Sequence, residues 1–159
     1  MRYRFIDEIV SVVTDPPRIE VAKTFARTDD AFSGPAGPDR VPASLVLELL
    51  AMTGGQLLFR HLGRERLPLL LKIEDLRFGA DARPGDRLTA RVALQGKAAA
   101  AADTMAQTVG EVLGDRGALV ASGRFFYLCV TLPDGAELGD LVPTAAAEGP
   151  GETRPEVPS

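Results

Sequence analysis

The sequence PASLVLELLAMTGGQLL, residues 42–58, predicts the long helix around which the rest of the chain folds. Ala, Leu, Met and Glu favour helix, and Pro42 suits the first helical position, where a missing N–H costs nothing. Apolar side chains point in every direction from this helix: Leu45, Val46, Leu47, Leu49, Leu50, Ala51 and Met52. A helix that is apolar all round is normally buried. At roughly 25 Å it is too short to span a membrane.

Glu48 is the one charged residue within this apolar run. Burying a lone carboxylate is costly, so a buried Glu48 needs partners or a raised pKa. Carboxylates perturbed in this way cluster at functional sites, which makes Glu48 a candidate catalytic residue. The alternative is a Glu48 that reaches a solvated edge or caps a neighbouring backbone group.

The length of 159 residues and the apolar content of 45% predict one soluble globular domain with a proper core. The first eight residues lack an apolar stretch, so no secretory signal is expected. The single Cys129 excludes an internal disulfide framework and a Cys-rich metal site, and it fits a reducing cytoplasm. The single His61 argues against a histidine metal centre or a Ser-His-Asp triad, and we interpret it as an exposed helix-end residue.

Charge divides the chain into two parts. Residues 132–159 carry six acidic residues and one arginine, together with five prolines, and we predict an acidic, Pro/Gly/Ala-rich, disordered tail. The first 131 residues are close to neutral and form the expected folded domain. Because no basic run is present, we expect no nucleic-acid partner.

Strand patterns surround the predicted helix. Residues 1–13 predict a short helix or strand, and residues 29–41 predict an irregular loop that leads into the helix. Residues 67–78 predict a strand that begins fully buried, whereas residues 98–102 are ambiguous. The other expected strands are 18–26, 87–94, 104–113 and 118–132, with turns at 15–17, 82–86 and 114–117.

One long helix followed by long antiparallel strands predicts an α+β fold in which a curved antiparallel sheet wraps the helix. A sheet covers only one face of so apolar a helix. We therefore predict a dimer, in which a second copy covers the remaining sides.

Four short segments also resemble a known family. They are RFIDEIV at 4–10, DAFSG at 30–34, the helix start at 42–51, and LRF at 76–78 with RPGDRL at 83–88. These are similar to the family patterns R-F-x-x-V/I-D-x-V/I, E-x-F-F-x-G, P-G-V-x-x-V/I-E-A-M/L-A and R-F-x-x-x-V-x-P-G-D-x-L. In this order they resemble the hotdog-fold β-hydroxyacyl-acyl carrier protein dehydratases of the FabZ and FabA type.

The resemblance implies a hotdog fold, a dimer and a site on acyl thioesters. It places Glu48 on the family's catalytic glutamate, and it implies no metal and no cofactor. Gly34 and the amides of Ala43 and Ser44 would bind the thioester carbonyl, aided by the helix dipole. The substrate-binding positions it implies are Phe32, Gly34, Pro42, Ala43, Ser44 and Phe78.

The sequence departs from the family pattern at the catalytic histidine. The family loop G-H-F-P-G-x-P-x-M-P corresponds to GPAGPDRVP at 34–42, which is one residue shorter and has Pro35 after the glycine. His61 lies on the far side of the helix and cannot easily replace it. Met52 stands where the family commonly has Gln. Asp29, Asp30 and Asp39 are alternative second acids.

Three functions therefore remain open. The chain is a dehydratase subunit that takes its histidine from a different chain, a thioesterase that uses Glu48, or a non-catalytic acyl-thioester binding module. Its partners would be an acyl carrier protein or coenzyme A thioester and a second hotdog chain, as a homodimer or heterodimer. Four basic residues after the helix would offer an acidic carrier protein a landing area: Arg60, Arg64, Arg66 and Lys72.

Overall fold

The computed structural model describes residues 4–29, 32 and 39–132. The expected tail and Gly34 lie outside these described residues. The elements along the chain are β1 (Glu8–Val13), β2 (Arg18–Thr24), α1 (Ala43–His61), β3 (Arg66–Phe78), β4 (Arg87–Ala100), β5 (Asp103–Leu113) and β6 (Leu119–Thr131). In the described part of the chain, no helix is long and apolar enough to cross a membrane.

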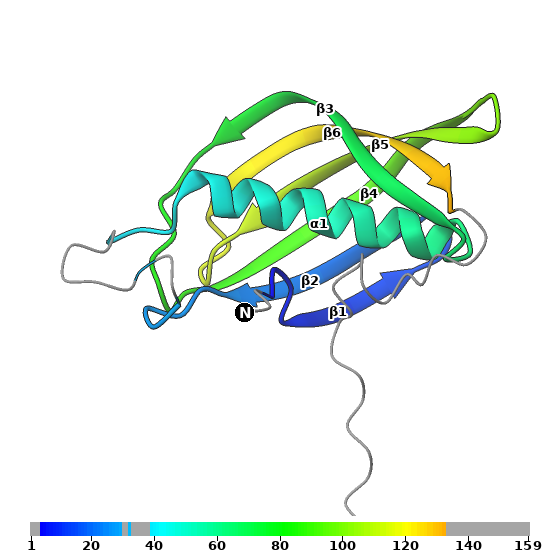
Figure 1. Cartoon of the computed structure of the whole chain (residues 1–159). Helices are drawn as coiled ribbons and strands as arrows, with labels where there is room; N and C mark the ends of the chain where they lie inside the picture. The colour runs from blue at the N-terminus through cyan, green and yellow to red at the C-terminus, as the bar shows by residue number, and fades with distance from the viewer. Residues whose placement is uncertain (1–3, 30–31, 33–38, 133–159) are drawn as a thin grey trace, which may run out of the picture.

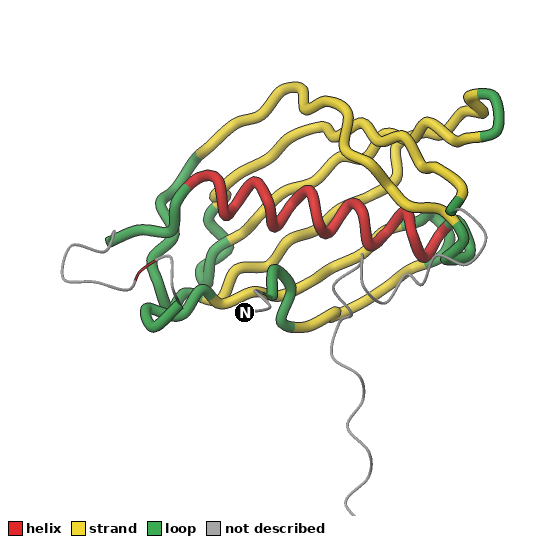
Figure 2. The backbone as a smooth tube through the Cα atoms, viewed as in Figure 1, coloured by secondary structure: helices red, strands yellow, loops and turns green. Residues whose placement is uncertain are grey.

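The six strands form one antiparallel sheet in the order β1-β2-β4-β5-β6-β3. The sheet curves around α1, which lies along its inner face (Figure 1). Figure 2 shows the same arrangement, with the single helix set against strands that extend beyond it. β1 and β3 are the two edge strands. After β2 the chain runs through α1 and enters β3 at the edge of the sheet opposite β1. The expected helix wrapped by a curved antiparallel sheet is confirmed.

Alternation along the strands builds the core. In β6, Phe125, Tyr127 and Cys129 face α1 and are buried, whereas the residues between them are half-buried on the other face. β4 shows the same pattern, with Leu88 and Val92 on the inner face. The expected strand periodicity is therefore confirmed.

Tyr127 fixes the helix to the sheet. Its hydroxyl donates a hydrogen bond of 2.8 Å to the carbonyl oxygen of Ala51 in the middle of α1. Burial raises the pKa of Tyr127, so the phenol keeps its proton and remains a donor at physiological pH. The helix approaches closely here because position 54 is glycine: a Cβ at Gly54 would lie 2.4 Å from the Tyr127 hydroxyl oxygen.

Two expectations about burial were wrong for the single chain. α1 is not buried all round, because Leu47, Ala51 and Met52 are only half-buried and Glu48 is exposed. The first half of β3 is not buried either, since Leu71 is 54% exposed. Both have one physical cause, which is that the sheet covers a single side of α1 and β3 is an edge strand. Pro42 is also the N-cap, and Ala43 is the first helical residue.

The close approach at Gly54 makes a prediction about stability. Gly54→Ala should lower the free energy of unfolding by about 1–3 kcal/mol, because the buried Tyr127 would have to shift to make room for a new methyl group. Gly55→Ala is the matched control, since a Cβ there meets nothing within 4 Å. It should raise stability by about 0.5–1 kcal/mol through helix propensity. Chemical unfolding measures both; equal effects of the two substitutions would contradict the close approach.

Candidate functional site

The first turn of α1 provides unpaired backbone donors. The carbonyl of Pro42 accepts from the N–H groups of Leu45 and Val46, at 3.0 and 3.3 Å. Ala43 and Ser44 are exposed, and their N–H groups donate to no acceptor within the described residues. These groups carry the positive end of the helix dipole, so this end of α1 is suited to a developing negative charge on a ligand oxygen.

Glu48 lies one turn further along the same face of α1. Residues four apart on a helix are neighbours, which places Glu48 beside Ser44 and, on the other side, Met52. Glu48 is exposed and forms no ion pair with a described residue. In the single chain Glu48 therefore reaches solvent, which is the alternative that the sequence left open. The face combines one carboxylate, two free amides and the half-buried side chains of Leu47 and Ala51.

The other expected substrate-binding residues fall in different environments. Phe32 is 3% exposed and belongs to the core beside the loop that precedes α1. Phe78 is 50% exposed at the end of β3, at the same end of the molecule as the beginning of α1 (Figure 1). Pro42 is half-buried. The structure therefore brings Pro42, Ala43, Ser44 and Glu48 together, with Phe78 at the same end.

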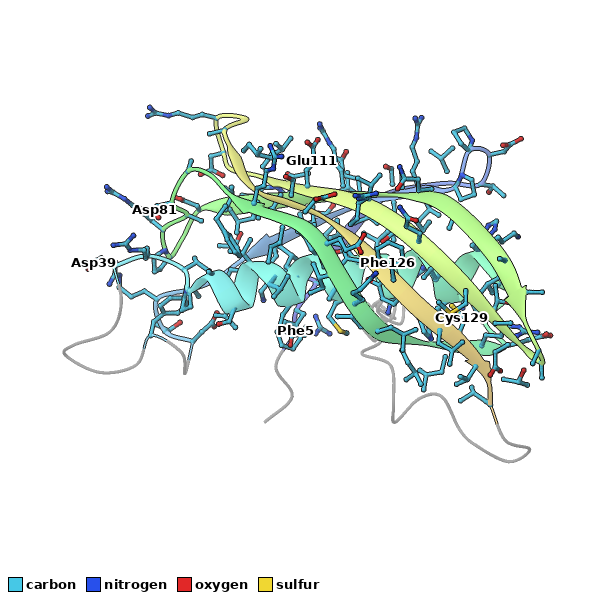
Figure 3. All side chains as sticks on the ribbon, turned by 90° about the horizontal axis from the view of Figure 1, so that it is seen from above. Phe5, Asp39, Asp81, Glu111, Phe126 and Cys129 are labelled. Atoms are coloured by element: carbon cyan, nitrogen blue, oxygen red, sulfur yellow. The ribbon has the colours of Figure 1, made fainter. Side chains whose placement is uncertain are left out.

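The structure places no second acid–base side chain beside Glu48 among the described residues. His61 ends α1, thirteen residues and about 20 Å along the axis from Glu48, as expected, but it is half-buried and not exposed. The carboxylate of Asp29 accepts a hydrogen bond of 2.9 Å from the N–H of Ala26 and is thereby part of a turn. Asp39 is exposed on the segment before α1, near Asp81 (Figure 3). Asp30 lies outside the described residues.

One cavity lies on the face of the sheet that points away from α1. Figure 3 shows Glu111 on that face, pointing away from α1. The cavity has a volume of about 580 Å³, and Arg91 and Glu20 form an ion pair of 2.9 Å on its wall. Its lining includes neither Glu48 nor the beginning of α1, so it is not the site that the sequence predicts.

The four basic residues expected after the helix divide into two groups, and Arg60 lies within the last turn of α1. Lys72 pairs with Glu74 at 2.6 Å and lies over the ring of Phe126, and Arg66 donates to the carbonyl of Ala102 at 2.9 Å. Arg60 and Arg64 instead line a cavity at the end of α1. No group of three or more His, Cys, Asp or Glu suited to a metal ion occurs within the described ranges.

Sequence comparisons show which known proteins this chain resembles. No family model matches the chain. The 3-hydroxyacyl-(acyl-carrier-protein) dehydratase FabZ of Thermotoga neapolitana is 38% identical over 91 residues, which is 55% of this chain. The match spans 63% of that curated relative, which is less than two thirds of its length.

Solved structures with a similar fold cover a larger share of this chain than the FabZ match does. A hypothetical thioesterase protein from Streptococcus pneumoniae TIGR4, solved with coenzyme A, has a TM-score of 0.61 at 10% identity and covers 78% of this chain and 88% of that one. The yhdA protein of Lactococcus lactis has a TM-score of 0.65 at 12% identity and covers 80% and 94%. This chain has the hotdog fold. The fold expected from the sequence motifs is thereby confirmed, and the chain is similar to FabZ over the matched stretch.

The exposure of Glu48 predicts that this carboxylate contributes little to stability. Glu48→Gln should leave the free energy of unfolding within about 0.5 kcal/mol of the wild type, because no described partner loses a contact. Thermal or chemical unfolding measures this. A loss of several kcal/mol would show that Glu48 holds a buried interaction and would contradict its place on the open face.

Proposed function

We propose that this hotdog chain acts on acyl thioesters, with the thioester carbonyl at the beginning of α1 and Glu48 as its reactive side chain. The observation that carries the proposal is one exposed carboxylate a single turn from two backbone N–H groups that have no acceptor among the described residues. The similarity to FabZ supports 3-hydroxyacyl or enoyl thioesters of an acyl carrier protein or coenzyme A as substrates.

The carbonyl oxygen of the thioester would accept from the N–H groups of Ala43 and Ser44. Removing a proton from C2 places negative charge on that oxygen, and preorganised backbone donors stabilise such charge. The positive end of the helix dipole adds to this effect. Gly34 remains part of the proposal from the sequence motif alone.

Dehydration needs two groups: a base that takes the proton from C2 and an acid that protonates the departing hydroxyl at C3, which leaves as water. Glu48 would supply one of them. Because no histidine lies within reach of Glu48 in the described chain, the second group would come from a histidine on a different hotdog chain. In this arrangement the chain is one half of a heterodimeric dehydratase.

A second candidate function is thioester hydrolysis. It is favoured by the single carboxylate, because hydrolysis needs only one base to take a proton from the attacking water while the helix amides stabilise the tetrahedral oxyanion. The S. pneumoniae neighbour is named as a thioesterase. A non-catalytic binding module would use the same amides without turnover.

Activity assays with Glu48→Gln test the proposal. A trans-2-enoyl thioester is incubated with the purified chain, alone and with a histidine-containing dehydratase homologue, and both hydration and thiol release are measured. We expect Glu48→Gln to lower the active reaction by about 10²–10⁴, because the substitution removes a general acid–base group.

The pattern of activity separates the candidates. Hydration that requires the homologue supports the heterodimer, whereas thiol release by the chain alone supports the thioesterase. Full activity in Glu48→Gln would overturn the role of Glu48. Binding without turnover in every combination would assign the chain to the binding-module class and would overturn both catalytic proposals.

The open faces of α1 and β3 support a second chain as partner. The exposed leucines Leu69, Leu70 and Leu71 lie on the thirteen-residue edge strand β3. An unpaired apolar edge is a template for pairing with another chain. The opposite edge is shorter, since β1 has six residues and a register shift between Ile9 and Ser11. We therefore propose that the dimer forms through β3 and that the half-buried face of α1 faces the partner.

A charge on β3 tests this interface. Leu71→Lys should convert the dimer into a monomer in sedimentation or light scattering, because the ammonium would be desolvated between the two chains. Val10→Lys is the control, since Val10 is 43% exposed on the opposite edge strand. It should leave the mass unchanged. Dissociation by Val10→Lys but not by Leu71→Lys would place the interface on β1 instead.

A further inference from the structure

A second cavity lies at the end of α1 that is remote from Glu48. Its volume is about 240 Å³, which equals the volume of about eight water molecules in the liquid at ~30 Å³ each. This is enough for a small anion with part of an attached molecule. The lining residues are Val12, Val13, Thr14, Pro17, Leu57, Arg60, His61 and Arg64.

The polar wall of this cavity is cationic. Arg60 and Arg64 line it, and the ammonium of Lys97 lies 3.1 Å from Nε2 of the lining residue His61. Among the described residues, no carboxylate oxygen lies within 4 Å of the nitrogens of these four side chains. Burial and the neighbouring Arg64 lower the pKa of Arg60. Like charges therefore face one another here without a described counter-charge.

Individual donors in the cluster are also unused. Nε of Arg60 is buried and forms no hydrogen bond in the described chain. Because an ammonium group can only donate, Nε2 of His61 accepts from Lys97, and the neutral ring then carries its hydrogen on Nδ1. The cluster therefore includes a guanidinium N–H and an imidazole N–H without a described acceptor, and the buried Nε of Arg60 would have to turn toward the cavity to meet a ligand.

The helix end accounts for these cations only in part. The negative end of the helix dipole favours basic side chains here, but at three of the last carbonyls backbone N–H groups, and not basic side chains, are the donors. The bonds are Leu62 N–H to Leu58 oxygen, Gly63 N–H to Arg60 oxygen and Arg64 N–H to Phe59 oxygen, at 2.9, 3.2 and 2.8 Å.

Arg64 occupies a position that the backbone would give to glycine. Its φ of 64° lies in the left-handed region, directly after Gly63 at 73°. Side chains with a Cβ are disfavoured in this region, so an arginine here costs stability that glycine would not. A strained residue that lines a cavity of cations without a described counter-charge is better explained by what it binds than by what it stabilises.

We propose that this cavity binds a phosphate group, either free or as the phosphate ester of a small ligand. Several cationic donors around one site match a dianion better than a single carboxylate, and the guanidinium fork fits phosphate oxygens. The apolar wall at Val12, Leu57 and Pro17 would contact the body of an esterified ligand. The donors are Arg60, His61, Arg64 and Lys97.

Thermal unfolding of the full chain tests the proposal. Inorganic phosphate and coenzyme A are each titrated against chloride at matched ionic strength, and we expect either anion to raise the melting temperature. Arg64→Gly should weaken the response about tenfold or more, while the melting temperature without anion stays equal or rises because glycine suits the backbone. Lys97→Gln should also weaken it, and Arg116→Gln, in the distant turn at 114–117, should not.

The outcomes are distinct. A response to inorganic phosphate that Arg64→Gly removes identifies free phosphate as sufficient, and a response to coenzyme A alone that Arg64→Gly removes identifies an ester; both support the site. No response beyond chloride, or equal responses in Arg64→Gly and Arg116→Gln, overturns it. Glu48→Gln should keep the response, so the outcome does not depend on the thioester proposal.

Discussion

The hydrogen bond from Tyr127 to the carbonyl of Ala51 is the contact on which the arrangement of this molecule depends. It forms because Gly54 lets the helix approach β6 closely, and it fixes which side of α1 faces the sheet. With that side fixed, Ser44 and Glu48 must lie on the opposite, open face. A constraint in the core thereby sets the direction of the candidate catalytic carboxylate.

The two ends of α1 have opposite chemical character. The beginning offers N–H groups without an acceptor in the described part of the chain, beside one carboxylate, which suits a carbonyl oxygen that gains negative charge during a reaction. The far end gathers Arg60, His61, Arg64 and Lys97 around a small cavity, which suits an anion that is already charged. One helix therefore holds both proposed sites at its opposite ends, and each can be tested without disturbing the other.

Much of the fold follows from local sequence pattern. The alternation in β4 predicted its inner face, and the apolar run at 42–58 predicted α1. The alternation in β6 separated its two faces without saying which one is buried. Burial at Leu71 was predicted incorrectly and burial at Glu48 was left open, because an apolar pattern does not say whether the same chain or a partner covers a residue. The cationic cavity was only partly foreseen, because Lys97 joins it through contacts between β4 and α1 that are 36 residues apart in sequence.

The central claim is that the beginning of α1 binds the thioester carbonyl. The most direct measurement is the ¹⁵N–¹H spectrum of the chain, recorded with a non-reactive thioether analogue of an acyl coenzyme A. We expect the largest shifts at the amides of Ala43 and Ser44, with smaller ones at Glu48. Shifts confined to the cavity of Arg91 and Glu111 on the other face of the sheet, with Ala43 and Ser44 unchanged, would contradict it.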